Sequence, residues 1–531
     1  QILLALNNSL VITMLPPEYL EHVSDDIVAL YSELDQRIVR DVVRRLMKTG
    51  RVTDTATWQI QRAQESGMLY DEIIAEVTRY SNKSEQQVRA LFKDIGLKAV
   101  EYDSPIYTSA GLSPPPLSMA PAAQQVLNAG LAKTSGYLQN LTQTTASGAQ
   151  QAFIHAATIA EMQVDSGAFD YVSAIRNAIR TAIEGGEWVT YPTGHRDRLD
   201  VATRRAVLTG VNQTASEVSL SYTDDMGCDL VETTAHAGAR PEHQVWQGRV
   251  FSRSGKSKRH PDFVKSTGYG TGPGLCGWNC RHNFYPYFEG LSESAYPKSE
   301  LKEYENQTVT YNGGKIKYYD ATQKQRAMER AIRDSKRQAA GFDEAVKSAK
   351  DEATATAMKQ EFNSAAVKLK QQESILKDFT QKTGLERQRN LEQVFGFSHS
   401  QSSKAIWVNK KVDIQRQRDI IKEEIRSAGK LPKAAKIHLT PTPINTDSLS
   451  FDDKHINAER GHNVTQEQTT KWIRDAKISV TVWNGQYERY YGVEGAVYVD
   501  KIKSLVRTAY PSGQYEDNVK AMLEVILKNG L

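Results

Sequence analysis

The chain has 531 residues, of which 39% are hydrophobic and 24% charged, and its formal net charge is +4. This length predicts about two to four domains rather than one core, and the small net charge does not by itself require a nucleic-acid partner. Three cysteines exclude a disulfide framework, and no stretch reaches the ~18–20 apolar residues of a membrane-spanning helix.

The first predicted region, residues 1–103, is helical. Its opening run lacks a basic leader and a small-residue cleavage site, so we do not expect a signal peptide. Met14 precedes two prolines that suit a helix start, so it is the more natural first residue, and residues 1–13 would be an artefact of translation or expression. A long amphipathic helix then follows, with Gly50 as its stop. Its apolar stripe is formed by Leu20, Val23, Ile27, Leu30, Leu34, Ile38, Val42 and Leu46.

Two more amphipathic segments are predicted around residues 71–80 and 84–97, with Ser84 and Gln87 as a capping box at the start of the second segment.

A proline-rich linker is predicted at residues 104–121, because three consecutive prolines cannot continue a helix. The next region, residues 122–227, is helical again, and its last helix is predicted to run from Asp200 to about Ser221. Its earlier helices are rich in Ala, Gln and Thr and poor in bulky apolar side chains. We therefore expect them to pack closely with one another or against a partner.

Residues 228–297 differ in kind, because Gly, Pro, His, Trp and Tyr dominate and predict loops with short strands. Thiolate and imidazole groups are ligands that zinc accepts, and four of them close a tetrahedral structural site. The candidate ligands are Cys276, Cys280 and His282, which form a C-x3-C-x-H pattern, and His236 and His243 upstream. A pair of free thiols, or a Cys276–Cys280 disulfide in an extracellular particle, remains an alternative. Cys228 is expected to be a lone thiol.

This block also carries a local basic excess. Between residues 240 and 282 there are eight Lys or Arg residues against Glu242 and Asp262, with aromatic residues interleaved. That composition favours contact with packaged DNA or with an acidic neighbouring subunit. A solvated basic loop would show the same composition. The glycines of residues 268–277 predict a tight loop, but no strand–turn–helix frames them as a phosphate-binding motif.

Residues 298–428 are predicted as charged helices with a thin apolar stripe, which can form a hairpin or a coiled coil. The stripe consists of Phe342, Ala345, Ala349, Ala353 and Ala357. Basic residues alternate with acidic residues here, so we do not expect a DNA-binding surface.

After a second linker at residues 429–450, residues 451–531 form a small predicted α+β domain. The order is a helix at 465–476, strands at 478–483, 488–493, 495–500 and 504–510, and a helix at 515–528. The predicted fold class is therefore multidomain, with mainly helical N-terminal and middle regions, an irregular Gly/His/Cys block and a small C-terminal α+β domain.

The C-terminal domain carries a candidate RNA-cleaving site. Metal-independent RNA cleavage needs a base, an acid and cations that stabilise the phosphorane charge. The candidate residues are His455, Arg460, His462, Thr508 and Tyr510. The two histidines can also simply cap or pack at the helix start, or bind a metal as a pair.

Two sequence blocks carry a resemblance to a known family: HAGARPEHQVWQGRVFS at 236–252 and STGYGTGPGLCGWNCRHNFYPYFEG at 266–290. The chain resembles the phage minor capsid protein 2 family, and more distantly the Mu protein F-like head-morphogenesis proteins, over roughly residues 14–430. The resemblance implies a virion protein present in few copies at the portal vertex inside the head, assembled in the bacterial cytoplasm. Its implied partners are portal and major capsid proteins, and no catalytic residue carries over.

The C-terminal domain, over about residues 450–528, resembles the barnase–EndoU–colicin–RelE-like nucleases that occur as additions to phage head proteins. The resemblance depends on the helix-then-four-strand order, the H-x4-R-x-H group at 455–462 and the RTAY strand. It implies an RNase-like effector with RNA as its substrate. One alternative is an inert C-terminal binding module. Another is a zinc-dependent nucleic-acid-processing enzyme centred on Cys276–His282, for which Glu242 is the only nearby acid–base carboxylate.

Overall fold

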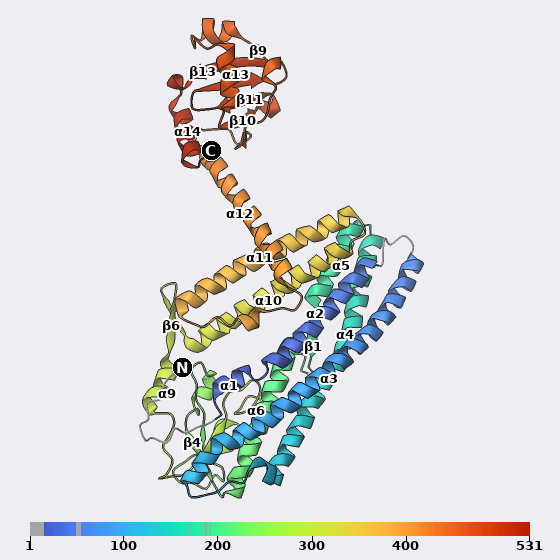
Figure 1. The fold of residues 1–531 in the computed structure, drawn as a ribbon, viewed down its shortest axis with the longest axis vertical. Coiled ribbons are helices and arrows are strands. Elements are labelled where there is room, and N and C mark those ends of the chain that lie inside the picture. The colour runs from blue at the N-terminus through green and yellow to red at the C-terminus, as the bar shows by residue number, and fades with distance from the viewer. Residues whose placement is uncertain (1–14, 49–54, 168, 186–187, 192, 531) are drawn as a thin grey trace. The chain divides into compact units, whose positions relative to one another are not determined.

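The computed structural model describes residues 15–48, 55–167, 169–185, 188–191 and 193–530. Its contacts divide the chain into two compact units, residues 1–406 and 407–531, and helix α12 (His399–Ala428) crosses the boundary (Figure 1). The first unit is mainly helical and the second contains the largest sheet, which confirms the predicted fold class. The predictions for residues 1–13, Met14 and Gly50 lie outside the described residues. Among the described residues, no helix is long and apolar enough to cross a membrane.

The short helix α1 and a set of long helices build the first unit. They are α1 (Pro17–His22), α2 (Asp25–Lys48), α3 (Thr55–Ser109), α4 (Pro121–Asp165), α5 (Tyr171–Gly185), α6 (Leu199–Asp225), α10 (Tyr318–Ser348) and α11 (Glu352–Thr383). The predicted stripe of the first helices faces their neighbours, because most of its members are buried: Leu20, Ile27, Leu34, Ile38, Val42 and Leu46. Periodicity of three and four residues thus identified the packed face of α2 correctly.

Helix α3 is continuous from Thr55 to Ser109 and includes Pro105, so the two predicted segments form one helix. The predicted capping box at Ser84 is wrong, because this residue lies in the helix interior. Its hydroxyl donates to the carbonyl oxygen of Ser81 at 2.9 Å and lies 3.3 Å from the hydroxyl of Tyr31 on α2. The hydroxyl therefore joins two packed helices instead of starting one.

Helices α4 and α6 approach closely at two reciprocal positions, as the small residues of α4 predict. A Cβ atom added to Gly130 would lie 2.0 Å from Thr214 Oγ1, and one added to Gly210 would lie 2.1 Å from Thr134 Oγ1. Each glycine therefore receives a threonine of the opposite helix, and any larger residue there would force the two helices apart.

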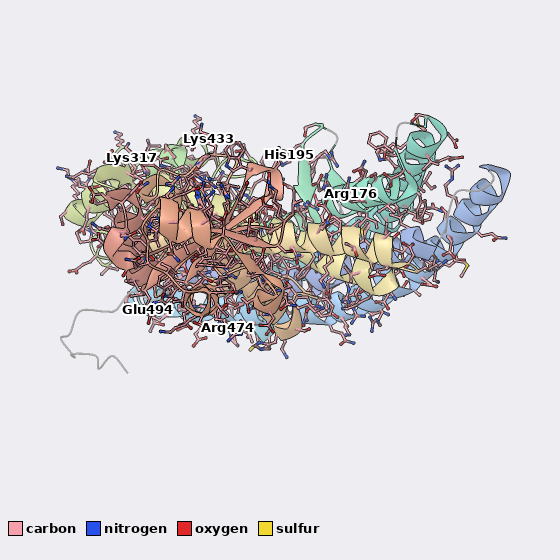
Figure 2. The ribbon with its side chains drawn as sticks, turned by 90° about the horizontal axis from the view of Figure 1, so that it is seen from above. Arg176, His195, Lys317, Lys433, Arg474 and Glu494 are labelled. Carbon is pink, nitrogen blue, oxygen red and sulfur yellow. The ribbon has the colours of Figure 1, made fainter. Side chains whose placement is uncertain are left out.

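Helices α10 and α11 form a hairpin, one of the two arrangements expected for this region. Arg337 of α10 is buried between two carboxylates, with Nη2 3.2 Å from Asp200 Oδ2 on α6 and Nε 3.4 Å from Asp35 Oδ2 on α2. Arg176 of α5 is labelled in Figure 2, and its Nε lies 3.9 Å from Glu361 Oε1 on α11. Ion pairs thus connect the hairpin to the remaining helices.

Short elements fill the rest of the first unit. Three small sheets are built from β1 (Trp188–Thr190) with β2 (Arg196–Arg198), from β3 (Leu230–Thr233) with β4 (Val250–Ser252) and β5 (Phe284–Tyr287), and from β6 (Thr308–Tyr311) with β7 (Gly314–Lys317). The short helices are η1 (Leu117–Met119), α7 (Pro241–Gln244), α8 (Phe263–Thr267), α9 (Lys298–Asn306) and η2 (Arg389–Glu392). The Gly/His/Cys block therefore consists of loops around strand β3, as predicted.

The second unit is a six-stranded sheet of order β8-β10-β11-β12-β13-β9, antiparallel except for the β13–β9 pair. Its strands are β8 (Lys436–His438), β9 (Ser450–Phe451), β10 (Ile478–Val482), β11 (Tyr487–Tyr491), β12 (Gly495–Asp500) and β13 (Leu505–Pro511). The helical elements are η3 (Thr446–Ser448), η4 (Lys454–Glu459), α13 (Gln466–Arg474), η5 (Trp483–Gly485), η6 (Ser512–Gln514) and α14 (Asp517–Lys528). The four predicted strands and both helices lie within about two residues of their predicted positions. Residues 429–450, predicted as a linker, contribute β8 and η3.

Both faces of this sheet are covered, because alternate strand residues point to opposite sides. Val480 and Tyr491 pack in the core that contains α14, and Val497 and Val506 pack in the core that contains α13. Ile425 near the end of α12 belongs to the first of these cores. The sheet therefore has two hydrophobic cores inside one unit.

Candidate functional site

The Gly/His/Cys block is tightly packed because its glycines admit close backbone contacts. A Cβ atom added to Gly274 would lie 2.0 Å from the carbonyl oxygen of Gly268, and one added to Gly277 would lie 2.1 Å from that of Gly272. Cys276 has a left-handed backbone conformation, with φ of 57°. Such a conformation costs a non-glycine residue ~1–3 kcal/mol, so the surrounding loop must impose it.

Three of the five predicted metal-ligating residues come together in this loop: His243, Cys280 and His282. His243 Nδ1 lies 3.4 Å from His282 Nδ1, and Cys280 Sγ lies 3.7 Å from each of these nitrogens. All three side chains are buried. A group with this composition and spacing can hold a metal ion.

The second nitrogen of each imidazole contacts a fixed oxygen. His243 Nε2 lies 2.8 Å from the carbonyl oxygen of Pro273, and His282 Nε2 lies 3.0 Å from Gln247 Oε1. Burial, helped by the neighbouring His236 and His243, holds the pKa of His282 well below its ordinary value, and burial also lowers the pKa of His243. Both rings are therefore neutral near pH 7, and each has one nitrogen without a proton.

The other two predicted ligands, His236 and Cys276, are buried beside this group but contact other atoms. His236 Nδ1 lies 2.8 Å from the carbonyl oxygen of Ala237, and its ring stacks on His282 with 4.4 Å between centroids. Cys276 Sγ lies 3.6 Å from the carbonyl oxygen of His282. The structure thus separates the five candidates into three that converge and two that do not.

All three cysteines are free thiols in this structure, which favours the free-thiol interpretation of Cys276 and Cys280 over a disulfide. Burial raises the pKa of both thiols, so they are protonated at neutral pH unless a cation binds. Cys228 is a lone thiol, as predicted, whose sulfur lies 3.3 Å from the carbonyl oxygen of Leu230.

Two amide side chains that position this group were missed by sequence reasoning. Asn212 of α6 donates from Nδ2 to the carbonyl oxygens of Cys280 and His282, both at 2.9 Å. Gln247 Oε1 accepts from the backbone N–H of His236 at 3.2 Å and also faces His282. An Asn inside a helix and a Gln after a Trp give no local signal, because their hydrogen-bond partners lie 11 to 70 residues away along the chain.

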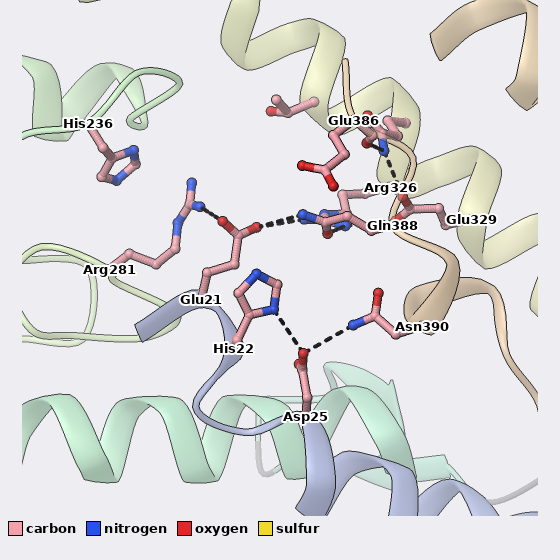
Figure 3. Close-up of polar contacts among 12 residues, drawn as sticks. Glu21, His22, Asp25, His236, Arg281, Arg326, Glu329, Glu386, Gln388 and Asn390 are labelled. Atoms are coloured by element: carbon pink, nitrogen blue, oxygen red, sulfur yellow. Dashed lines mark hydrogen bonds and ion pairs between the residues drawn. The ribbon is translucent and has the colours of Figure 1, made fainter. Parts of the chain in front are cut away.

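The group borders a cleft of about 1770 Å³ within the first unit. Glu21 of α1 also borders this cleft and lies between two arginines (Figure 3), with Oε2 2.7 Å from Arg281 Nη1 and Oε1 3.0 Å from Arg326 Nη2. Burial opposes ionisation of Glu21, but the two arginines outweigh it and lower the pKa of this carboxyl. Glu21 therefore connects α1, the 280–282 loop and α10, a contact that no sequence motif indicated.

The predicted basic excess is partly used inside the protein. At least four of its eight residues contact acidic groups or carbonyl oxygens: Arg240, Arg253, Arg259 and Arg281. The other four are exposed: Arg249, Lys256, Lys258 and Lys265. The positive charge available to a partner is therefore smaller than the sequence suggests and extends from Arg249, just before β4, to the end of α8.

In the second unit, two of the five predicted catalytic residues come together: His462 and Tyr510. Their ring centroids are 5.6 Å apart, and His462 Nδ1 lies 2.5 Å from Gln514 Oε1. The hydroxyl of Tyr510 lies 2.7 Å from that of Tyr498, which lies 3.1 Å from that of Tyr491. A row of three hydroxyl groups therefore ends beside an imidazole.

Arg489 of β11 joins this group and was not predicted. Its guanidinium lies 4.7 Å from the ring centroid of Tyr498, its cross-strand partner on β12. Burial raises the pKa of Tyr510 to about 12 and also raises the pKa of Tyr498, so both hydroxyls remain protonated at neutral pH. Strand alternation could have placed Arg489 on this face, but only after the pairing register was known.

The remaining three predicted catalytic residues lie apart from that row or at its side. His455 Nδ1, in η4, lies 2.9 Å from Glu459 Oε2, and Arg460 is exposed at the end of this turn. Thr508 of β13 is the cross-strand partner of Tyr498. Over the described part of the chain, no hydrogen bond or ring contact joins the imidazoles of His455 and His462.

The chain was compared with families, curated proteins and solved structures, and the family match lies within the first unit. A family model described as phage minor capsid protein 2 matches residues 15–381. A curated protein of Lactococcus phage LL-H, named "Structural protein", is 26% identical over 328 residues, which cover 57% of this chain and 84% of that protein. No solved structure matches the chain. The family match includes α1 through α10 and the whole Gly/His/Cys block, whereas the second unit lies beyond it.

Proposed function

Because this chain belongs to the phage minor capsid protein 2 family, we propose that it works at the portal vertex inside the phage head, in few copies. It is a phage structural protein, and membership of a capsid-protein family places it in the virion. The partners in this proposal are the portal and major capsid proteins, and assembly takes place in the cytoplasm of the bacterial host.

The observation that carries this proposal is the extent of the family match, which spans residues 15–381. The cleft of the first unit supports a macromolecular partner, because its volume of about 1770 Å³ exceeds the ~300–1,000 Å³ of ordinary small-molecule sites. Its wall carries arginines and carboxylates together, which suits a polar protein surface.

The location can be tested on assembled particles. Quantitative mass spectrometry of gradient-purified heads should find this chain in a copy number close to that of the portal protein and far below that of the major capsid protein. Cryo-electron microscopy without imposed icosahedral symmetry should then place its density at one vertex. Absence from purified heads, or equal density at all vertices, would contradict the proposal.

Packaged DNA is a second partner in this proposal, supported by the exposed lysines Lys256, Lys258 and Lys265. Neutralising three phosphates predicts that log Kd changes with log salt with a slope of about 3. The triple lysine-to-glutamine variant should reduce that slope to near zero in a fluorescence-anisotropy titration with duplex DNA. An unchanged slope would assign these lysines to a solvated loop.

For the second unit, the proposal is an RNase-like effector that acts on RNA without a metal. The supporting observation is the group of His462, Tyr510, Tyr498 and Arg489 on one face of the sheet. His462 can transfer a proton, the tyrosine hydroxyls can donate hydrogen bonds, and Arg489 can stabilise a phosphorane charge. His455, Arg460 and Thr508 remain in the proposal on the strength of the sequence pattern.

The nuclease proposal is tested by incubating the full chain with total tRNA in the presence of EDTA. Cleavage should occur, and His462→Ala should slow it by about 10²–10⁴-fold, the usual contribution of a general acid or base. The matched control is His438→Asn, which changes a histidine that contacts Thr481 in the same sheet. No cleavage by the wild-type chain would leave an inert binding module as the function of this unit.

A structural zinc ion is the cofactor that fits this proposal. A zinc-dependent nucleic-acid-processing activity has no comparable support, because Glu242, the nearby carboxylate, is exposed on α7.

A further inference from the structure

We propose that His243 Nδ1, His282 Nδ1 and Cys280 Sγ bind one zinc ion, with a solvent molecule as the fourth ligand. Cys276 and His236 are not ligands in this assignment. The site belongs to the first unit alone, so it would be present in the isolated chain whether or not the chain sits at a portal.

The spacing of the three atoms agrees with tetrahedral zinc. With Zn–N bonds of ~2.0–2.1 Å and a Zn–S bond of ~2.3 Å, tetrahedral angles place two nitrogens ~3.4 Å apart and a sulfur ~3.6 Å from each nitrogen. The structure has 3.4 Å between the nitrogens and 3.7 Å from the sulfur to each nitrogen. One ion therefore fits between these atoms without moving the backbone.

The hydrogen bonds of the two imidazoles determine which ring nitrogen carries the proton. In both rings it is Nε2, so Nδ1 has a free lone pair. A peptide carbonyl can only accept, so His243 Nε2 must carry the proton that it gives to Pro273. Gln247 Oε1 is identified as an oxygen because it also accepts from the backbone N–H of His236, so His282 Nε2 is a donor too. Both Nδ1 atoms are then lone-pair acceptors that face each other.

Two buried acceptors 3.4 Å apart repel each other unless a cation lies between them. The thiol hydrogen of Cys280 can satisfy only one of the two nitrogens. Metal-bound histidines typically have this arrangement, in which the distal N–H donates to a carbonyl or amide oxygen that fixes the ring. The arrangement around His243 and His282 is therefore the one expected of a prepared metal site.

The ligand types select zinc among common divalent ions, because thiolate and imidazole in a tetrahedral arrangement suit it best. His236 and Cys276 leave the fourth position to solvent, because among the described residues only His243, Cys280 and His282 have ligand atoms that all lie within 4.8 Å of one another. Bound zinc would join α7 to the 280–282 loop, which Asn212 attaches to α6 and Arg281 attaches to α1 through Glu21. The ion would thus tie together segments that are distant in the sequence.

The proposal is tested on the full chain, purified without chelator and dialysed into metal-free buffer. Elemental analysis should find one zinc per chain, and Cys280→Ser and His243→Ala should each bind less than a tenth of it. Cys228→Ser and Cys276→Ser serve as matched controls, because both remove a buried thiol and should retain one zinc. A folded wild-type chain without zinc would overturn the site, and loss of zinc from Cys276→Ser would overturn the three-ligand assignment.

A second measurement begins with the wild-type chain alone, so its first result does not depend on how well a variant folds. Adding Co²⁺ alone to the metal-stripped wild-type chain should produce the intense visible bands of tetrahedral cobalt and a near-ultraviolet thiolate band. Gln247→Leu, which removes the acceptor for His282, should weaken zinc binding by ~10–100-fold at unchanged stoichiometry. The proposed coordination would be contradicted if cobalt gave nothing but the weak bands of an octahedral ion, or if Gln247→Leu bound zinc as tightly as the wild-type chain.

Discussion

Replacing Asp103 with asparagine should stabilise the first unit, and the gain should increase with pH. Asp103 lies on α3 with 5% of its surface exposed, and its carboxyl group accepts a hydrogen bond of 2.7 Å from Ser219 Oγ on α6. Burial outweighs this hydrogen bond and raises the pKa of Asp103 from 3.8 to about 7. The folded chain therefore favours the protonated carboxyl, which the unfolded chain ionises near its ordinary pKa.

The sign and size of the effect follow from these two pKa values. Between them the folded state binds more protons than the unfolded state, so the free energy of unfolding falls as pH rises. One pKa unit corresponds to ~1.4 kcal/mol. The free energy of unfolding that is lost through the raised pKa of Asp103 is therefore small below pH 3.8, ~2 kcal/mol at pH 5 and ~4 kcal/mol at pH 8. Asparagine carries no charge and can still accept from Ser219, so its advantage should grow by ~2–3 kcal/mol between these pH values.

Urea denaturation followed by far-ultraviolet circular dichroism at pH 5 and pH 8 measures this difference, because the first unit contributes most of the helical signal. Comparing the variant with the wild type at each pH cancels the titration of all other groups. Asp71→Asn, an exposed position on the same helix, should change stability by less than ~0.5 kcal/mol at both values. An advantage of Asp103→Asn that is equal at the two pH values would refute the reasoning.

Two further substitutions test the packing and the charge network of the first unit. Gly274→Ala should lower the free energy of unfolding by at least ~3 kcal/mol, because its Cβ atom would lie 2.0 Å from a carbonyl oxygen. Gly67→Ala, whose Cβ atom would have nothing within 4 Å, should instead stabilise α3 by ~0.5–1 kcal/mol. Thermal denaturation compares the two variants, and equal shifts would contradict the packing argument. Arg337→Ala should cost ~3–5 kcal/mol, because it removes the buried cation that lies between the carboxylates of Asp35 and Asp200. Arg89→Ala, which breaks an exposed ion pair, should cost less than ~1 kcal/mol. If urea titrations show a similar loss of stability in Arg337→Ala and Arg89→Ala, burial does not determine how much an ion pair contributes to this unit.

Elements with a strong local pattern could be predicted from the sequence. The stripe from Leu20 to Leu46 placed the buried face of α2, and alternation in the C-terminal segment placed β10 to β13. The prediction at Ser84 was wrong, because a capping motif inside a continuous amphipathic pattern carries less weight than the packing of α3 against α2. Strand β8 was not predicted, because three residues within a proline-rich stretch give too little periodicity.

The candidate sites were predicted only as sets of residue types. The sequence named five possible metal ligands, and the structure brings together His243, Cys280 and His282. It named five possible catalytic residues, and the structure joins His462 and Tyr510 while adding Arg489 and Tyr498. Spacing along the chain cannot distinguish a ligand from a buried neighbour, because that depends on which atom faces the common point.

The sequence by itself determined the helical and strand periodicities, the loop character of the Gly/His/Cys block and the family to which the chain belongs, because these depend on residues that are close along the chain. Only the tertiary structure decided that Asn212 and Gln247 hold the loop of the candidate metal ligands and that Glu21 joins α1 to two arginines far away in the sequence. Such contacts form between side chains that the packing of separate helices brings within hydrogen-bonding distance. Their energy depends on a burial that no local stretch of sequence specifies.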